Sequence, residues 1–538
     1  MTTFTGPPPD TEPGIGPLTL GGLLDEVCAR HPSREAIAFC QPGAPPLRFT
    51  YAELATHSRR MAKALVAAGT DKGTRVALLM GNRPEWIFSV FGVALAGGVL
   101  VPVNTLFEPP EIAHVLAHSD SALLIHQQRL ARHDYDQQIR LIESDLPYLR
   151  RRVGLATPSY DKFLAAGDDV SDAVLDARAG AVSPFDDALV IYTSGSTGVP
   201  KGVLHAHRAA ALQSWRFAQQ LCLDPSVRVW SAFPFFWTAG FCMIMGATLA
   251  AGGCLVLEEL FEPGEALAIM ETERVTSPHA WPHQLAALEE HPDWPRRDLS
   301  SLRHVISFTS LGRHPTVKVD DVWSPRAAYG LTETFTIVSS LPADTPPAQR
   351  DGHEGAILPG NAVRIVDRAT GELQPRGMPG EITVKGPTLM KGYLKVAPED
   401  VFDVDGFFPT GDAGFVDDDD MLHWAGRTND LIKTGGANVS PVEIETELLR
   451  HPGLKTALAV GVAHDTLGEV VVVCAVAHPG RGVDEDDVRA FLRGRLASYK
   501  IPRHVLFFDD DDLVLTGNAK IRTEDLRRLA ADRLLRQP

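Results

Sequence analysis

Cysteine is scarce in this chain of 538 residues, which contains six. They are Cys28, Cys40, Cys222, Cys242, Cys254 and Cys474. No two of them form a Cys-x-x-Cys pair, so the spacing indicates neither a zinc site nor a dense disulfide framework. We therefore expect reduced thiols and a cytoplasmic protein.

Positive charge is in deficit. Lys and Arg total 51 against 68 Asp and Glu, which gives a formal net charge of −17. A field of this sign disfavours polyanionic partners, so nucleic acid is not expected as a ligand. With 44% hydrophobic and 22% charged residues, the composition excludes a disordered chain and indicates a large globular protein.

Membrane signals are weak. Residues 1–17 lack the basic and apolar regions of a secretory signal, and their Pro/Gly-rich composition predicts a flexible tail. The uncharged run Val229–Leu257 is long enough to span a bilayer, which would suit a transporter. However, it contains Pro234 and Gly252-Gly253 and is typical of strand, loop, helix and strand in a sheet buried on both faces. We expect no transmembrane segment.

The fold class is predicted from alternating elements. Thr50 and Glu53 form a capping-box signature at the start of a helix. Further on, Arg75–Met80 is expected as a strand, Pro84–Ala96 as a helix and Val99–Val103 as a strand. This alternation predicts an α/β fold with parallel βαβ units.

The pattern of predicted elements changes toward the C-terminus. Short strands at Ala362–Val366 and Glu381–Lys385 between Gly/Pro turns predict a small β-rich subdomain. The last part of the chain is predicted as a small α+β domain. We therefore expect a large N-terminal domain over residues 18–428 and a C-terminal domain over residues 429–538.

The most informative local pattern is the loop Tyr-Thr-Ser-Gly-Ser-Thr-Gly-Val-Pro-Lys-Gly at 192–202, with three glycines and four Ser or Thr residues. Backbone N–H groups, hydroxyls and a lysine are what phosphate oxygens need, and we expect the loop between a buried strand and a helix. The spacing is not that of a P-loop, and a flexible Ser/Gly linker is the alternative. The candidate phosphate-binding residues are Thr193, Ser194, Gly195, Ser196, Thr197, Gly198 and Lys201.

Four further motifs follow in order: Tyr329–Thr334 (YGLTET), Thr410–Asp412 (TGD), Gly426–Gly436 (GRTNDLIKTGG) and Thr516–Lys520 (TGNAK). Together with the loop, they resemble the adenylate-forming superfamily of acyl-CoA synthetases, peptide-synthetase adenylation domains and luciferases. The resemblance implies a two-step ligase. A carboxylate attacks Mg-ATP to give an acyl-adenylate and pyrophosphate, and the thiol of coenzyme A then displaces AMP. ATP, Mg²⁺, coenzyme A and a small carboxylic acid are the implied ligands, and a homodimer is left open.

The resemblance assigns roles in the nucleotide site. The Thr193–Lys201 loop would hold the β- and γ-phosphates. Glu333 would offer an oxygen ligand to Mg²⁺, and Thr332 a hydroxyl near the α-phosphate. Tyr329 and Gly330 would lie at adenine. The segment Ser307–Gly312 differs from the usual adenine-contacting turn, so the residues that touch adenine there stay open.

Other roles fall on the later motifs. Asp412 would accept hydrogen bonds from the ribose hydroxyls, although an Asx-turn alone could explain an Asp at this place. Arg427 would reach the same ribose edge. Lys520 would bridge the carboxylate and the α-phosphate as the catalytic lysine. Asn429 falls at the hinge about which the family rotates its C-terminal domain, and Gly436 would line the pantetheine tunnel.

The acyl pocket is implied by Phe233–Phe241, which resembles the family's pocket motif. Trp237 and Phe241 would border the substrate, with Trp281 and Phe308 as further walls; ordinary core packing is the alternative. The motif contains no acidic residue. Because a buried ammonium group needs a partner, an amino acid substrate is disfavoured.

The substrate is therefore expected to be a hydrophobic acid. A medium- or long-chain fatty acid is the leading expectation, with aryl, alicyclic and sterol-derived acids as alternatives. An adenylation enzyme that loads a carrier protein is a further alternative. From a different class, the chain could be a catalytically silent nucleotide-binding sensor.

Overall fold

The computed structural model describes residues 2–194, 200–319, 322–350, 352–427, 432–434, 437–439, 441–465, 467–493, 495–496, 500–509 and 523–535. The chain divides into two compact units. The larger comprises Thr5–Ala362 and Val384–Phe408, and the smaller comprises Met1–Phe4, Val363–Thr383 and Pro409–Pro538. The predicted boundary at residue 428 lies outside the described residues and stays a prediction.

The first sheet of the larger unit has seven strands in the order β20-β11-β10-β5-β4-β6-β9. The strands are β4 (Arg75–Leu79), β5 (Val99–Pro102), β6 (Leu123–His126), β9 (Arg151–Gly154), β10 (Asp187–Ser194), β11 (Pro200–Ala206) and β20 (Gly392–Tyr393). The five neighbouring strands β10, β5, β4, β6 and β9 pair in parallel, which confirms the predicted βαβ units.

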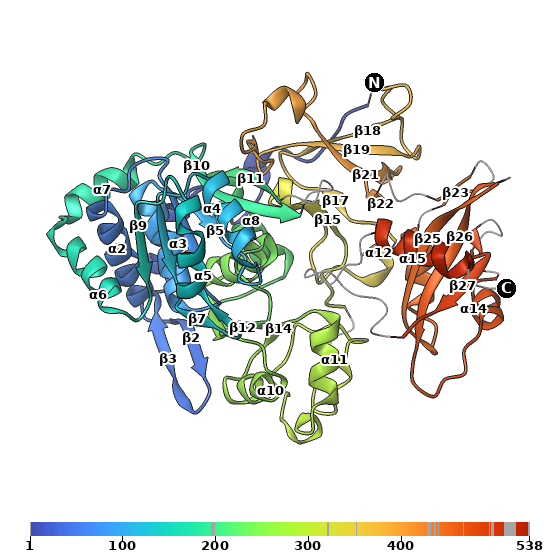
Figure 1. The fold of residues 1–538 in the computed structure, drawn as a ribbon, viewed down its shortest axis with the longest axis horizontal. Coiled ribbons are helices and arrows are strands. Elements are labelled where there is room, and N and C mark those ends of the chain that lie inside the picture. The colour runs from blue at the N-terminus through green and yellow to red at the C-terminus, as the bar shows by residue number, and fades with distance from the viewer. Residues whose placement is uncertain are drawn as a thin grey trace. The chain divides into compact units, whose positions relative to one another are not determined.

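Helices cover this sheet because their apolar faces need a partner. The helices of this part are α1 (Leu20–Arg30), α2 (Tyr51–Ala67), α3 (Pro84–Ala96), α4 (Pro109–His118), α5 (Tyr135–Ile142), α6 (Pro158–Ala165), α7 (Asp172–Gly180) and α8 (His207–Gln220). α2 starts with the predicted capping box of Thr50 and Glu53, and packs beside α3 (Figure 1). α3 has the predicted bounds, and its side chains are almost all buried.

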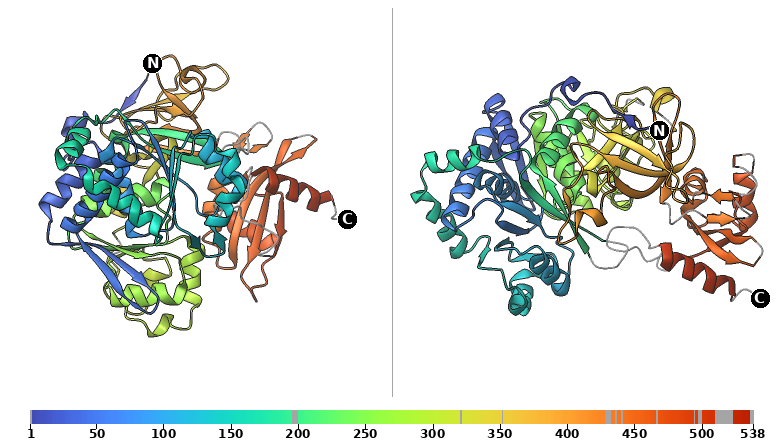
Figure 2. Two further views of the ribbon diagram at one scale, coloured as in Figure 1. Left: turned by 60° about the vertical axis from the view of Figure 1, so that its left-hand side comes forward. Right: turned by 90° about the horizontal axis from the view of Figure 1, so that it is seen from above.

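The second sheet has the order β14-β12-β13-β2-β3. Its strands are β2 (Glu35–Gln41), β3 (Ala44–Thr50), β12 (Arg228–Ser231), β13 (Cys254–Glu258) and β14 (Ser277–His279). β2 and β3 form an antiparallel hairpin that projects from the unit (Figure 2). Two helices, α10 (Pro263–Thr272) and α11 (Pro282–Glu290), follow β13 and β14 along the chain.

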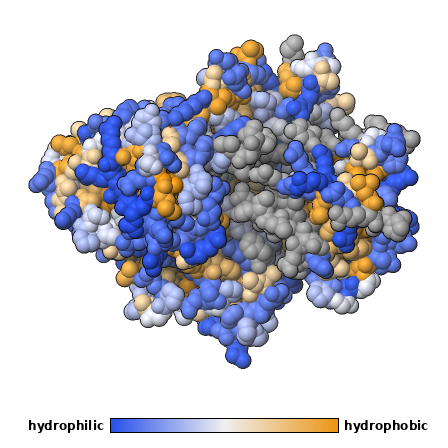
Figure 3. Space-filling model, in the orientation of Figure 1, coloured by the Kyte–Doolittle hydropathy of each residue, from blue (hydrophilic) through white to orange (hydrophobic). Residues whose placement is uncertain are grey.

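The uncharged run 229–257 belongs to this sheet and its connection. It forms β12, a π-helix η4 (Ala239–Gly246), α9 (Ala247–Ala250) and β13. Among the described residues, no helix combines the length and the apolar character that crossing a bilayer requires. Figure 3 shows hydrophobic residues scattered among hydrophilic ones on one face of the molecule.

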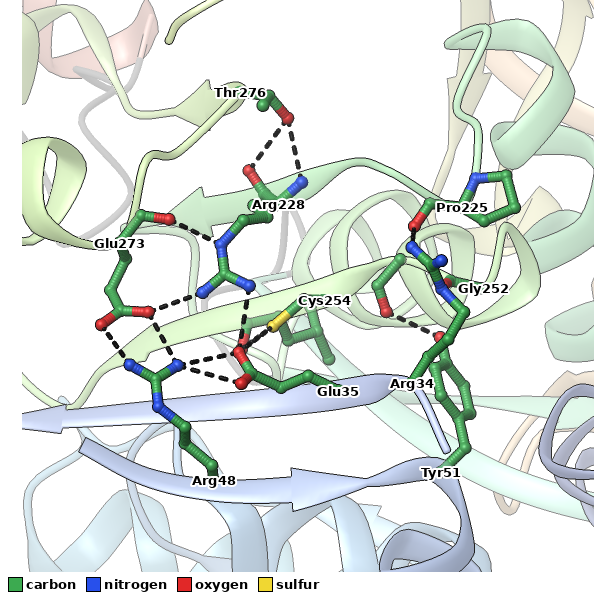
Figure 4. A network of polar contacts seen from close by, with 12 residues as sticks. Arg34, Glu35, Arg48, Tyr51, Pro225, Arg228, Gly252, Cys254, Glu273 and Thr276 are labelled. Carbon is green, nitrogen blue, oxygen red and sulfur yellow. Dashed lines mark hydrogen bonds and ion pairs between the residues drawn. The ribbon is translucent and has the colours of Figure 1, made fainter. Parts of the chain in front are cut away.

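A polar network joins the first residues of β2, β12 and β13 to Arg48 of β3 and to Glu273, which follows α10 (Figure 4). Arg228 Nη2 lies 2.6 Å from Glu273 Oε2, and Arg48 Nη2 lies 2.7 Å from Glu273 Oε1. Both arginines also contact Glu35, at 3.0 and 2.9 Å. The Cys254 thiol donates to Glu35 as well, and all six cysteines are free thiols, as expected. These charges are mutually compensated, so removing any one of them would leave a partly buried charge without its partner.

The N-terminal segment is packed against the larger unit. Arg216 is fully buried and forms an ion pair with Glu12 (2.8 Å). Trp215 Nε1 donates to the Pro17 carbonyl (3.1 Å), and the Gly6 N–H donates to the Asn361 carbonyl (2.9 Å). This path differs from the flexible tail that the composition predicts, because tertiary contacts satisfy the backbone and charges of the segment.

A small antiparallel sheet completes the larger unit, with strands β15 (Ala328–Leu331), β16 (Thr336–Ser340) and β17 (Ala356–Ile357). The larger unit also contains a separate two-stranded hairpin, β7 (Arg129–Leu130) with β8 (His133–Asp134), and the short helix α12 (Pro347–Arg350).

The smaller unit is β-rich at its start and α+β beyond, as predicted. One sheet has the order β1-β18-β19-β21-β22 and the other β24-β23-β26-β25, with β27 on β26. The strands of the first are β1 (Phe4–Thr5), β18 (Ala362–Val366), β19 (Gly380–Lys385), β21 (Phe408–Val416) and β22 (Leu422–Arg427). The second comprises β23 (Ile432–Thr434), β24 (Ala437–Val439), β25 (Leu454–His464), β26 (Gly468–Ala477) and β27 (His504–Phe507), with helices α13 (Pro441–Leu448), α14 (Glu485–Leu492) and α15 (Thr523–Leu535).

Candidate active site

The expected phosphate loop is the tip of a β-hairpin. β10 and β11 pair antiparallel, with Thr193 opposite Lys201 and Ser194 opposite Pro200. The prediction of a helix directly after the loop is wrong, because β11 comes first and α8 starts only at residue 207. β11 forms because β10 and β20 both supply it with backbone partners. Gly195, Ser196, Thr197 and Gly198 lie outside the described residues.

Two histidines of α4 hold the base of this hairpin. His118 Nδ1 shares a hydrogen bond of 2.9 Å with the Tyr192 hydroxyl, and His114 Nε2 donates to the Pro200 carbonyl over 3.0 Å. Burial lowers the pKa of His118, and the neighbouring His114 lowers it further. The sequence does not predict this support, since nothing local links α4 to the loop.

The YGLTET motif forms β15 and the 3₁₀ turn Thr332–Thr334 (η7). Tyr329 is buried, with 6% of its surface exposed. A Cβ atom on Gly330 would lie only 1.7 Å from the Thr336 carbonyl oxygen, so no larger residue fits. The motif therefore requires glycine for the close approach of two strands.

The turn is fixed from β11 and α8. Complete burial lowers the pKa of His205 to about 3, so the imidazole is neutral and Nε2 donates to the Thr332 carbonyl (2.9 Å). Gln213 Nε2 donates to the carbonyls of Thr334 (3.3 Å) and Ile337 (2.7 Å). The turn that carries Thr332 and Glu333 is thereby bonded to β11, the strand that carries Lys201.

The structure brings Lys201 and Glu333 together through a tyrosine. The Tyr393 hydroxyl donates to Glu333 Oε1 over 2.7 Å, and Lys201 Nζ lies 5.2 Å from the centre of the Tyr393 ring. Tyr393 lies in β20, where it pairs with Val203 of β11. The Met390 N–H donates to the Glu333 carbonyl over 2.7 Å. Sequence reasoning missed Tyr393.

The surroundings of Glu333 fit a magnesium ion that is bound together with a nucleotide. Mg²⁺ in such sites uses one or two carboxylates, substrate phosphates and water. Within the described parts of the chain, no group of three or more His, Cys, Asp or Glu residues could enclose a metal. Glu333 Oε1 accepts from Tyr393, and Oε2 makes no hydrogen bond with a described residue. A single carboxylate of this kind suits the expected ligand.

The TGD motif lies in the smaller unit, on β21. Asp412 is 4% exposed, and its N–H donates to the Thr410 hydroxyl (3.1 Å). Gly411 has φ +73°, and its N–H donates to Glu381 Oε1 over 3.0 Å. Arg427 of β22 is the direct cross-strand partner of Asp412.

Four bulky aromatic side chains gather in and near the expected acyl motif. The rings of Phe233 and Trp281 lie 4.3 Å apart at an interplanar angle of 31°. Trp237 packs edge-on against Phe236 (5.1 Å) and Trp281 (6.4 Å). Trp237 and Trp281 are both partly exposed. The structure therefore brings together two of the four predicted pocket residues.

The backbone of this motif is held by Asn82, which follows β4. Asn82 Nδ2 donates to the Phe233 carbonyl, and Oδ1 accepts from the Phe235 N–H, both over 2.9 Å. Asn82 is 9% exposed. The side chain thus bridges the two residues that flank Pro234 and fixes the path that leads to Trp237.

The other two predicted pocket residues lie elsewhere. Phe241 is completely buried, with ring centroids 5.7 Å from both Trp86 and Phe335. It therefore closes the core behind the site. Phe308 is 55% exposed, and the Arg326 guanidinium lies 4.8 Å from its ring centre. No ring contact joins it to Trp237 or Trp281.

Three predicted residues of the smaller unit lie outside the described residues: Asn429, Gly436 and Lys520. The side chains of Ser194 and Arg427 are likewise not described. Their roles stay predictions.

The chain matches known protein families over most of its length. The AMP-binding enzyme family matches residues 24–394, and the AMP-binding enzyme C-terminal domain matches residues 443–520. A feruloyl-CoA synthase of an Amycolatopsis species is 34% identical over 89% of this chain and 93% of its own. An indoleacetate–CoA ligase of Aromatoleum aromaticum is 32% identical over 96% and 98%.

Among solved structures, apo MatB from Rhodopseudomonas palustris superimposes with a TM-score of 0.73 at 28% identity, covering 96% of this chain and 99% of MatB. The family match extends over well more than half of the chain. The 192–202 loop and Tyr329–Thr334 lie within the first matched region, and Thr516–Lys520 lies within the second. The chain therefore belongs to the AMP-binding enzyme family and, with it, to the acyl-CoA synthetase branch of the adenylate-forming superfamily.

Proposed function

We propose that this protein is an ATP-dependent acid–CoA ligase that activates a hydrophobic carboxylic acid as an acyl-adenylate and transfers the acyl group to coenzyme A. The observation that carries the proposal is the cluster of Lys201, Tyr393 and Glu333. It holds a cation and a carboxylate at the base of a Ser/Thr/Gly loop, which is the arrangement that a metal–triphosphate needs.

The substrate class that we favour is a ring-containing acid. The face of Trp281 against Phe233 and the edge of Trp237 offer flat aromatic surfaces. Phe241 is completely buried against Trp86 and Phe335 and adds no exposed aromatic surface to this group. The feruloyl and indoleacetate ligases named above act on ring acids, which supports the aryl alternative over the fatty acid first expected.

The proposed site residues would neutralise the charge of the nucleotide and hold it in position. The Lys201 ammonium group would neutralise charge on the β- and γ-phosphates, and Glu333 would orient the metal that it binds. When bound, Mg²⁺ supplies Lewis-acid stabilisation of the phosphate oxygens. The Thr332 carbonyl accepts a hydrogen bond from His205, and the Thr332 hydroxyl would face the α-phosphate. Asp412 would hold the ribose.

The test is product analysis with purified protein, ATP, Mg²⁺ and a panel of ring and fatty acids. We expect pyrophosphate and AMP to form only with a suitable acid, and a thioester to form only when coenzyme A is added. ADP and inorganic phosphate as products would contradict the proposal.

Lys201→Met should abolish pyrophosphate release. The matched control is Lys385→Met, because the Lys385 ammonium also lies over an aromatic ring, 5.8 Å from the centre of Phe407. Lys385 has no role in the proposed site, so its variant should keep the wild-type rate. Equal losses in both variants would contradict the assignment of Lys201.

The remaining alternatives give other results in the same assay. A carrier-protein-loading enzyme would make acyl-AMP but no CoA thioester. A nucleotide sensor would bind ATP and release no pyrophosphate with any acid.

A further inference from the structure

We propose that Tyr393 is a positioning residue that keeps the Lys201 ammonium and the Glu333 carboxylate apart, so that both charges remain available to a metal-bound nucleotide. The inference rests on the proposed function. Tyr393 belongs to none of the five motifs that identify the family in this sequence.

The Tyr393 hydroxyl binds Glu333 directly. Its donation to Oε1 over 2.7 Å is a hydrogen bond to a charged acceptor, which is stronger than one between neutral groups. It leaves Oε2 without a hydrogen bond to the described residues. The bond therefore fixes the rotamer of the carboxylate while one oxygen stays open to a ligand.

The Tyr393 ring faces Lys201. A cation 5.2 Å from the ring centre is attracted by the negative face of the aromatic system, without neutralisation of its charge. Lys201 and Glu333 each contact Tyr393, and within the described residues no ion pair joins the two side chains directly. A direct ion pair would consume the two charges that a metal–triphosphate needs, and the ring is the group between them.

The placement of Tyr393 is firm because the backbone on either side of it is bonded. The Met390 N–H donates to the Glu333 carbonyl (2.7 Å), and the Leu394 N–H donates to the Gly202 carbonyl (2.8 Å). β20 thus spans from the turn that carries Glu333 to the strand that carries Lys201. A spacer in this position can act on both groups at once.

Two substitutions separate the two contacts. Tyr393→Phe keeps the ring over Lys201 and removes the hydroxyl that bonds to Glu333. Tyr393→Leu removes both contacts and lets Lys201 approach Glu333. The matched control is Tyr51→Phe, which removes another tyrosine hydroxyl with a 2.7 Å bond, to the Gly253 carbonyl, away from this cluster.

The experiment is equilibrium binding of ATP to the full-length protein by calorimetry, with saturating Mg²⁺ and with the metal removed by EDTA. For Tyr393→Phe we expect affinity for Mg-ATP to fall about tenfold, since a hydrogen bond to a charged group is lost, and affinity for metal-free ATP to change less than about twofold. For Tyr393→Leu we expect both affinities to fall. Tyr51→Phe should change neither.

Equal losses for Tyr393→Phe with and without metal would overturn the inference, and so would wild-type affinity for Mg-ATP in both Tyr393 variants. If wild-type protein releases pyrophosphate with an acid while Tyr393→Phe binds Mg-ATP normally, only the inference fails. If the wild-type protein does not bind Mg-ATP, the inference and the proposed function both fail.

Discussion

Asn82 offers the sharpest link between packing and substrate recognition. Its side chain makes two 2.9 Å hydrogen bonds to backbone groups of Phe233 and Phe235, which are 8% and 1% exposed. Asn82→Ala would leave a buried carbonyl and a buried N–H without partners, at about 1–3 kcal/mol each. We therefore expect a loss of about 2–6 kcal/mol in the free energy of unfolding, and a fall in Tm on the order of 5 °C or more.

The same substitution frees the backbone that leads to Trp237. Because positional errors of about 1 Å can cost 10²-fold in rate, we expect the KM for the acid to rise on the order of tenfold or more while the KM for ATP changes little. Thermal unfolding and acid-dependent pyrophosphate release measure the two effects. Asn104→Ala is the control, since the Asn104 side chain, among the described residues, bonds only to the N–H of the exposed Leu106.

Two outcomes would refute this reasoning. One is an Asn82→Ala protein that melts at the wild-type temperature. The other is an equal rise in KM for ATP and for the acid, which would mean that Asn82 supports the whole site and not the acyl motif.

Three further predictions follow from single positions. Gly330→Ala should abolish adenylation, because its Cβ would lie 1.7 Å from the Thr336 carbonyl oxygen; retained pyrophosphate release would show that the two strands can separate. Glu273→Gln should cost about 2 kcal/mol in thermal unfolding, because it removes the carboxylate, only 6% exposed, that faces Arg228; an unchanged Tm would contradict this. Burial raises the pKa of Glu258 to about 7, above its unfolded value of about 4.5, so the folded state holds the proton more tightly and stability should fall as pH rises from about 4.5 through 7. Glu258→Gln should flatten this fall in Tm with pH. An unchanged slope of Tm against pH would show that Glu258 is not its cause.

Much of the fold could be predicted where the signal is local. The capping box of Thr50 and Glu53 and the helix Pro84–Ala96 were readable, because caps and continuous apolar runs depend on neighbouring residues. The N-terminal segment was not, because the order of a Pro/Gly-rich stretch depends on the distant pair of Glu12 and Arg216. The π-helix at Ala239–Gly246 has no sequence period that distinguishes it from an α-helix.

In the site, too, local motifs could be predicted from the sequence and contacts between distant segments could not. Motif order predicted Lys201 and Glu333, which the structure places together, and Asp412 and Arg427, which it places opposite each other. Tyr393 could not be predicted, because its role arises from the pairing of β20 with β11, far apart in the chain.

Burial was the harder property to predict in the pocket. Motif register placed Phe241 at the substrate, but complete burial against Trp86 and Phe335 comes from tertiary packing. The exposed Phe308 likewise contacts Arg326, and not the other pocket aromatics.

The most direct test of the central claim is acid-dependent exchange of labelled pyrophosphate into ATP, run without coenzyme A. Exchange isolates the adenylation step, so it requires only the acid, ATP and Mg²⁺. We predict exchange with aryl or alicyclic acids and much weaker exchange with straight-chain acids of equal carbon number. Exchange that no acid supports, or that requires coenzyme A, would contradict the two-step adenylate mechanism. A clear preference for the straight-chain acids would contradict the proposed substrate class.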